Sequence, residues 1–182
     1  MTDHPPSTES RVSGDGPDVF VADEQDVIEI DRGHLARLAR DVLLAQGVRV
    51  PSELAVYFVD EPAIADLNGR FMGESGPTDV LAFPIDDDSL ESGRAPDAGT
   101  KGPDRSPADV SEIPLLLGDV FVCPAVAARN AAEQGGSLDD ELALLVVHGI
   151  LHVLGMDHAE PEEAAAMQRR ERELLARYHT GS

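Results

Sequence analysis

The chain has 182 residues, 42% of them hydrophobic, so it is long enough to bury one core and has the length of a single domain. Its formal net charge of −21 at pH 7 argues against broad, nonspecific nucleic-acid binding, because such binding needs a positive field. The single cysteine, Cys123, excludes a disulfide framework, and no apolar run reaches transmembrane length. We therefore expect a cytoplasmic protein with no membrane partner, since the polar N-terminal segment also lacks the apolar core of a secretory signal.

The predicted elements begin after a polar segment. Residues 1–17 are rich in Pro, Ser, Gly and Asp and are expected to form a disordered tail, and residues 18–182 are expected to form a single domain. The rest of the sequence alternates apolar runs with helix caps and with glycine or proline stops. In chain order it predicts a strand at 19–22 or 27–30, a helix at 32–46, a strand at 54–60, a helix at 61–71, strands at 80–83 and 115–124, and helices at 124–134, between Ser137 and Gly155, and at 161–177.

One segment between two strands contains almost no apolar residue. Residues 85–113 hold several Asp, Gly and Pro and predict a long acidic loop. The strands on either side of it are expected to pair like a hairpin. Because strands and helices mix along the chain, the predicted fold class is α+β, with a small mixed four-stranded sheet packed with about five helices.

Three of the six histidines fall within the segment HGILHVLGMDH at 148–158. His148 and His152 are four residues apart, so they share one face of a helix and can hold one metal ion. On a continuous helix, His158 would lie about 15 Å along the axis from His148, so the chain must turn back, which Gly155 permits. Three histidines leave a fourth position for water, as in catalytic zinc sites. The sequence therefore predicts one Zn²⁺ ion on His148, His152 and His158; the alternative is three unrelated histidines on a helix and its cap.

This spacing matches a zinc protease motif with one exception. In H-E-x-x-H-x-x-G-x-x-H the glycine and the third histidine have the offsets seen here, but Gly149 stands where the protease has its glutamate base. That glutamate activates the water that attacks the amide. Zinc can itself neutralise charge on the oxygens of a phosphate ester, so the missing glutamate favours phosphodiesters over peptides. No general base is identified from the sequence.

The same segment resembles the signature of the YbeY family, H-G-x-L-H-L-x-G-x-D-H, with Val153 in place of the second leucine. GPTDVLAFP at 76–84 resembles the family's P-T-[DN]-V-L-S-F-P, with Ala82 in place of serine. LLGDVFVCP at 116–124 resembles the family's L-G-D-[IV]-x-[IV]-[CS] strand. The three blocks occur in the family's order, and the similarity covers roughly residues 19–178.

The resemblance implies an α+β fold, a metal held by the three histidines, and a single-strand-specific, zinc-dependent endoribonuclease. Such a protein acts in 16S rRNA 3′-end maturation and in ribosome quality control, with ribosomal RNA and ribosomal particles as partners. The alternatives are a zincin-like metalloprotease and a non-catalytic ribosome assembly factor whose zinc is structural. The sequence indicates no oligomeric state.

The sequence departs from the family where many members carry an RNA-contacting arginine before the Gly-Pro-Thr loop. This chain has Met72 there, and Arg70 is the nearest replacement. Because the chain is acidic, RNA binding would need a local positive groove, for which Arg70, Arg129 and Arg169 are candidates.

Several other residues have two interpretations. Asp157 is either a partner for an imidazole N–H or a turn residue. Thr78 and Asp79 either border the cleft or cap the entry of a strand. His34 and His179 lie outside the ligand spacing and are expected at the surface.

Overall fold

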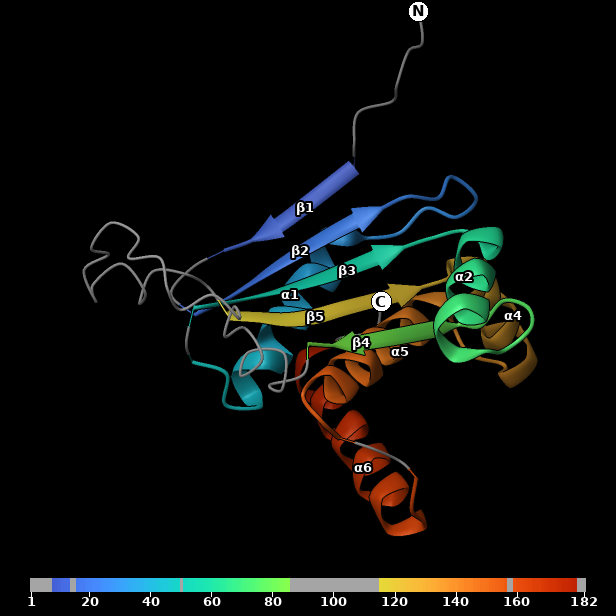
Figure 1. Cartoon of the computed structure of the whole chain (residues 1–182). Helices are drawn as coiled ribbons and strands as arrows, with labels where there is room; N and C mark the ends of the chain where they lie inside the picture. Colours follow the sequence, from blue (N-terminus) through green and yellow to red (C-terminus); the bar gives the residue numbers. More distant parts are fainter. Residues whose placement is uncertain (1–7, 14–15, 50, 86–114, 157–158, 180–182) are drawn as a thin grey trace, which may run out of the picture.

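The computed structural model describes residues 8–13, 16–49, 51–85, 115–156 and 159–179. These residues form one mixed sheet and a set of helices (Figure 1). The elements are β1 Thr8–Val12, β2 Pro17–Asp23, α1 Arg32–Ala45, β3 Ser52–Phe58, α2 Glu61–Leu67, the π-helix η1 Asn68–Met72, β4 Val80–Pro84, β5 Leu115–Val122, α4 Pro124–Gln134, α5 Leu138–Val153 and α6 Pro161–Tyr178.

The sheet has the strand order β1-β2-β3-β5-β4. Its central strands β2, β3 and β5 are parallel, whereas the edge strands β1 and β4 run antiparallel to their neighbours. Helices α1 and α5 pack on one face, where alternate strand residues such as Val21, Val56 and Val120 are buried. A smaller apolar cluster joins the other face of the sheet to α2 through Leu81 and Ile64. The α+β class and the antiparallel pairing of β4 with β5 are confirmed.

The sheet has five strands rather than the predicted four, because β1 lies within the segment expected to be disordered. Its ladder with β2 runs from the pair Thr8–Asp23 to the pair Val12–Val19. Arg11 also bonds Asp18 at 3.0 Å and Glu53 at 3.2 Å. The polar composition of this segment predicts disorder. Composition does not reveal that backbone hydrogen bonds to a neighbouring strand, together with ion pairs, can stabilise a polar edge strand.

Two other expectations meet different outcomes. The VIEI segment does not form a strand; Gln25 instead folds it into a turn through bonds to Asp23 and to the carbonyl of Ile28. Residues 1–7 of the expected tail, and the acidic loop from residue 86 to 113, lie outside the described residues.

Helix α5 is the most buried helix beside the sheet, with Val146, Ile150 and Leu151 fully excluded from solvent. Where it crosses β5 it carries Gly149. A Cβ atom at that position would lie 2.5 Å from Cγ1 of Val120, so no side chain fits between this helix and the sheet. Among the described helices, none combines the length and the apolar composition that crossing a bilayer demands.

Side-chain contacts hold α6 to the domain. Nε2 of His34 lies 2.9 Å from Nδ1 of His179, and Nε2 of His179 lies 2.8 Å from Oδ1 of Asp140. The hydrogen bond from His179 lowers the pKa of Asp140. Arg170 donates to Gln46 at 2.6 Å. The expectation that His179 lies at the surface is therefore wrong, because only 8% of its side chain is exposed.

Gly149→Ala tests the close contact of α5 with β5. The added methyl group meets the stiff, branched Val120, and overpacking of this kind costs about 1–3 kcal/mol, more than the helix propensity gained. We expect a net loss of stability on the order of 1 kcal/mol in urea unfolding. Gly136→Ala is the control, because a Cβ there meets nothing within 4 Å. A Gly149→Ala protein as stable as the control would contradict the contact.

Candidate functional site

The C-terminal end of α5 carries His148 and His152. The helix begins where the Ser137 side chain accepts a hydrogen bond from the N–H of Asp140 at 3.1 Å, and it ends at Val153. Gly155 follows with φ of +96°, a left-handed conformation that glycine adopts readily. The helix therefore stops directly after the second histidine, as the sequence predicted.

The two imidazole rings approach each other closely. Their Nε2 atoms are 3.0 Å apart, and the ring centroids are 4.5 Å apart. Two nitrogens bound tetrahedrally at about 2.0–2.1 Å from one zinc ion would be about 3.3 Å apart, so the pair has nearly the spacing of two ligands of one cation.

The predicted third ligand, His158, and its neighbour Asp157 lie outside the described residues. Within the part of the chain that the structure does describe, no group of three His, Cys, Asp or Glu is arranged to hold a metal. The prediction for His158 therefore remains a prediction.

A carboxylate from α6 completes the described part of the site. Nδ1 of His148 lies 2.5 Å from Oε1 of Glu171, so the ring N–H donates to the carboxylate. This hydrogen bond leaves Nε2 of the same ring to face His152. Glu171 is only 7% exposed. A carboxylate behind a histidine is common at metal sites, where it fixes the tautomer and orientation of the ring.

Glu171 was not predicted from the sequence, although one signal could have found it. Met167, Glu171 and Leu174 follow the spacing of the apolar stripe of α6, and all three are buried. A buried carboxylate in such a stripe needs a hydrogen-bonding partner from a neighbouring element. The packing that makes His148 this partner is not visible in the sequence.

A hollow opens beside these residues between α5 and α6. It has a volume of about 380 Å³ and is lined by His148, Ala164, Met167, Gln168 and Glu171. Helix α5 contributes the imidazole of His148 to this hollow, and α6 contributes the buried carboxylate of Glu171 and the exposed side chain of Gln168. His148 is thus within reach of a ligand from outside the domain.

Other candidate residues have structural roles. Cys123 is fully buried, and burial raises the pKa of its thiol, which disfavours the thiolate that a metal ligand must be. Asp79 accepts a hydrogen bond from Asn130 of α4 at 3.2 Å, and its backbone carbonyl accepts from the N–H of Cys123. Thr78 lies 3.4 Å from the Asp79 carboxylate. Neither Thr78 nor Asp79 lines the hollow beside His148.

Two of the three candidate arginines are paired with carboxylates. Arg70 lies 3.4 Å from Asp66, one turn earlier on the chain, and Arg129 of α4 pairs with Glu61 of α2. Met72, two residues after Arg70, is 46% exposed. Arg70 and Arg129 are therefore partly neutralised, whereas Arg169 makes no ion pair with any described residue.

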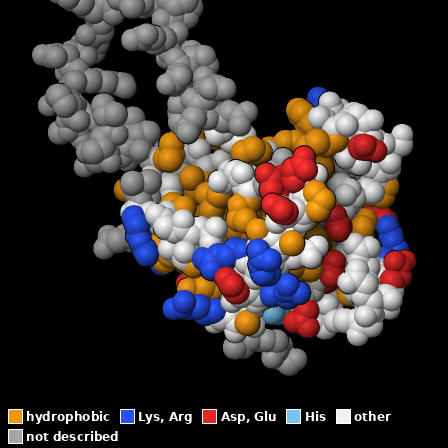
Figure 2. All heavy atoms as spheres, turned by 90° about the horizontal axis from the view of Figure 1, so that it is seen from below, with side chains coloured by type: hydrophobic (Ala, Val, Ile, Leu, Met, Phe, Trp, Pro, Cys, Tyr) orange, Lys and Arg blue, Asp and Glu red, His pale blue; other side chains and the backbone are white. Residues whose placement is uncertain are grey.

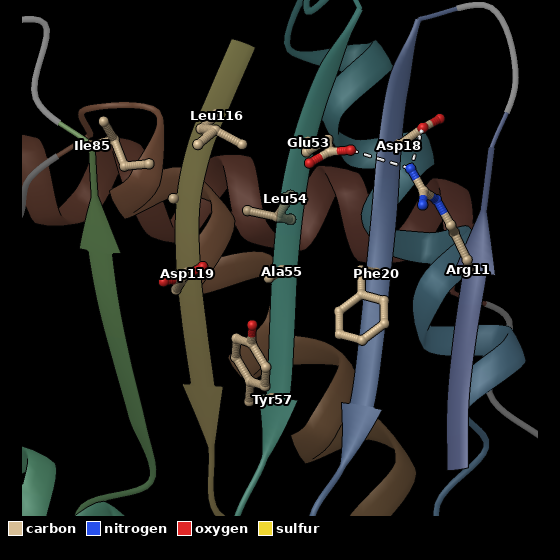
Figure 3. A pocket seen from close by; sticks show the side chains of 11 residues that line it. Arg11, Asp18, Phe20, Glu53, Leu54, Ala55, Tyr57, Ile85, Leu116 and Asp119 are labelled. Atoms are coloured by element: carbon tan, nitrogen blue, oxygen red, sulfur yellow. Dashed lines mark hydrogen bonds and ion pairs between the residues drawn. The ribbon is translucent and has the colours of Figure 1, made fainter. Parts of the chain in front are cut away.

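A second hollow lies on the sheet face that α1 and α5 do not cover (Figure 3). Its volume is about 340 Å³, and Arg11 bridges Asp18 and Glu53 along one side. Tyr57 and Asp119 lie on the neighbouring strands β3 and β5. Burial raises the pKa of Asp119, and burial with the nearby charges of Asp119 and Glu24 raises the pKa of Tyr57. This hollow contains no histidine.

Comparison with known proteins gives a consistent match. The family model described as Endoribonuclease YbeY matches residues 20–179. The Endoribonuclease YbeY of Frankia casuarinae is 48% identical over 159 residues, covering 87% of this chain and 73% of that protein. The Endoribonuclease YbeY of Thermobifida fusca is 49% identical over 158 residues, covering 87% of this chain and 92% of that protein.

A solved structure supports the fold. The solution structure of TM1509 from Thermotoga maritima matches with a TM-score of 0.51 and 23% sequence identity, covering 88% of this chain and 91% of that one. At this identity the likeness concerns the fold alone.

Asp119→Asn tests the electrostatics of the sheet face. The pKa of Asp119 is raised in the folded chain, so its ionised form destabilises the fold once the pH exceeds the folded-state pKa. Below the unfolded-state pKa of about 3.9 both states are protonated and the effect disappears. We expect the variant to melt above the wild type at neutral pH and the two melting curves to converge in acid. A difference that does not change with pH would contradict this account.

Proposed function

The chain belongs to the YbeY family of endoribonucleases, and from this premise we propose that it is a zinc-dependent, single-strand-specific endoribonuclease. Its proposed role is 16S rRNA 3′-end maturation and ribosome quality control in the cytoplasm, with ribosomal RNA and ribosomal particles as partners. The observation that supports the proposal most directly is the pair of Nε2 atoms 3.0 Å apart on α5, backed by Glu171.

The residues present fit a zinc ion. His148 and His152 supply neutral nitrogen donors on one helical face, and we propose His158 as the third ligand. Glu171 accepts the Nδ1–H of His148, which selects the tautomer whose Nε2 can bind a cation. Zinc in such a site lowers the pKa of bound water and neutralises charge on phosphoryl oxygens.

The chain itself binds and orients the substrate beside the histidines. The scissile phosphate would lie in the hollow lined by His148 and Gln168, where the amide of Gln168 can donate to a phosphate oxygen. The nucleophile is either water or the adjacent 2′-hydroxyl. Product ends distinguish them, because a 2′,3′-cyclic phosphate requires attack by the hydroxyl and a 3′-hydroxyl with a 5′-phosphate requires water.

The packing of α5 disfavours the metalloprotease alternative. A zincin needs glutamate directly after its first histidine, and this position is Gly149, where even a Cβ atom would clash with Val120. The non-catalytic alternative makes a different prediction. A structural zinc site holds the fold together, so loss of one ligand would unfold the protein.

His152→Ala separates these functions. We expect a folded protein that contains less than one zinc per chain and cuts single-stranded RNA at least about 100-fold more slowly than the wild type. Zinc content is measured by mass spectrometry, folding by circular dichroism, and cleavage on RNA and on an unstructured peptide in parallel. Unfolding of the variant would favour the assembly factor, and wild-type cleavage of the peptide but not of RNA would favour the protease.

Glu171→Gln tests whether the buried carboxylate supports metal binding. The amide can accept the Nδ1–H of His148 but carries no charge, so we expect the zinc affinity to fall about 10-fold or more. Affinity is measured by competition with a chromophoric chelator. Glu173→Gln is the matched control, because Glu173 is exposed on the same helix and pairs with Arg170. Equal zinc affinities in the two variants would refute a role for Glu171.

A further inference from the structure

The cationic side chains of this acidic chain are almost all arginines. All the cationic Lys or Arg side chains in the described part of the chain are arginines, and the single lysine, Lys101, lies outside it. The planar guanidinium of arginine binds phosphate through two parallel hydrogen bonds, which the point charge of lysine cannot do. A phosphate chain is therefore expected to bind where arginines are exposed and are not already paired with carboxylates.

Several of the described arginines serve the fold. Arg11 and Arg129 are held by carboxylates of neighbouring elements. Arg170 binds Gln46 and the carbonyl of Ala45, and also Glu173, so it anchors α6 to α1. Five arginines, Arg37, Arg49, Arg169, Arg172 and Arg177, are exposed and make no ion pair with any described residue. Of these five, Arg169 and Arg172 lie within four residues of Gln168 on α6.

No carboxylate lies three or four positions from Arg172 along α6. On a helix, the neighbours of a residue lie three and four positions away. For Arg172 these are Gln168, Arg169, Leu175 and Ala176. Two arginines that share a helix surface repel each other. Glu173 lies four positions after Arg169, but its carboxylate pairs with Arg170 at 3.2 Å. The guanidinium groups of Arg169 and Arg172 are therefore available to an anion from outside the chain.

The arginine pair adjoins the hollow beside the histidines. Gln168 lines this hollow, and Arg172 follows it by one turn, about 6 Å along α6 and about 40° around it. Arg169 lies about 100° around from Gln168, further from the hollow. Figure 2 looks onto the molecule from the side on which α6 lies in Figure 1, and Lys and Arg side chains gather near the middle of this face.

We infer that Arg172 and Arg169 bind successive phosphates of a single-stranded RNA whose scissile phosphate lies at His148 and His152. This inference rests on the proposed function and adds a path for the strand, from the hollow along the exposed face of α6. It also explains how a chain of net charge −21 can hold RNA without a broad positive field, because the bound phosphates are few and local.

The double variant Arg169→Gln/Arg172→Gln tests the inference. Binding of a short fluorescein-labelled single-stranded RNA to the full chain is followed by anisotropy in EDTA, which stops cleavage, between about 50 and 200 mM salt. We expect Kd to rise about 10-fold at the lower salt and the log–log salt slope to fall by about 1.4, or about 0.7 for each phosphate that is no longer neutralised. With the zinc-loaded protein, KM for RNA cleavage should rise while kcat stays within about twofold.

The control is Arg11→Gln/Arg129→Gln, which removes the same charge from arginines already held by carboxylates. An unchanged salt slope in the test variant, or a change equal to that of the control, overturns the inference while leaving a cleaving wild type intact. A wild type that binds RNA through these arginines but never cuts it overturns the proposed function instead. A wild type that neither binds nor cuts RNA overturns both.

Discussion

The close packing of α5 against β5 is the constraint on which the site depends. Because Gly149 brings the helix within contact of Val120, the rotation of α5 relative to the sheet is fixed. His148 and His152 then lie about 60–100° around the helix from Gly149, on the side where α6 packs. Helix α5 therefore contributes both core residues and imidazole nitrogens of the kind that bind metals. Its position is set by buried packing rather than by a loop.

Helix α6 has a larger part in the site than its sequence suggests. It contributes Glu171 behind His148, one wall of the hollow, and the exposed residues Arg169 and Arg172 beside that wall. Its position is fixed by Arg170 at the end of α1 and by the hydrogen bond of His179 with Asp140. Interactions remote from the histidines thus determine whether the carboxylate reaches the ring, and the surface that we propose for RNA depends on the same docking.

Local signals make much of the fold predictable. The bounds of α4 follow from Pro124 and Gly135, and α5 begins after its Ser137 cap. The spacing of His148 and His152, with Gly155 after them, predicts that the two rings meet near the end of one helix, and they do. Long-range interactions are not predictable in this way, because β1 is held by its ladder with β2, and Glu171 meets His148 only after two helices pack together. The position of His158 remains a prediction.

X-ray absorption at the zinc edge of the purified full-length protein tests the central claim most directly. The account predicts one zinc per chain, with a nitrogen shell at about 2.0–2.1 Å and the outer-shell scattering of imidazole rings. Cys123 is fully buried, so no sulfur shell at about 2.3 Å is expected. A sulfur shell, a shell of oxygen alone, or a chain that takes up no zinc would contradict the account.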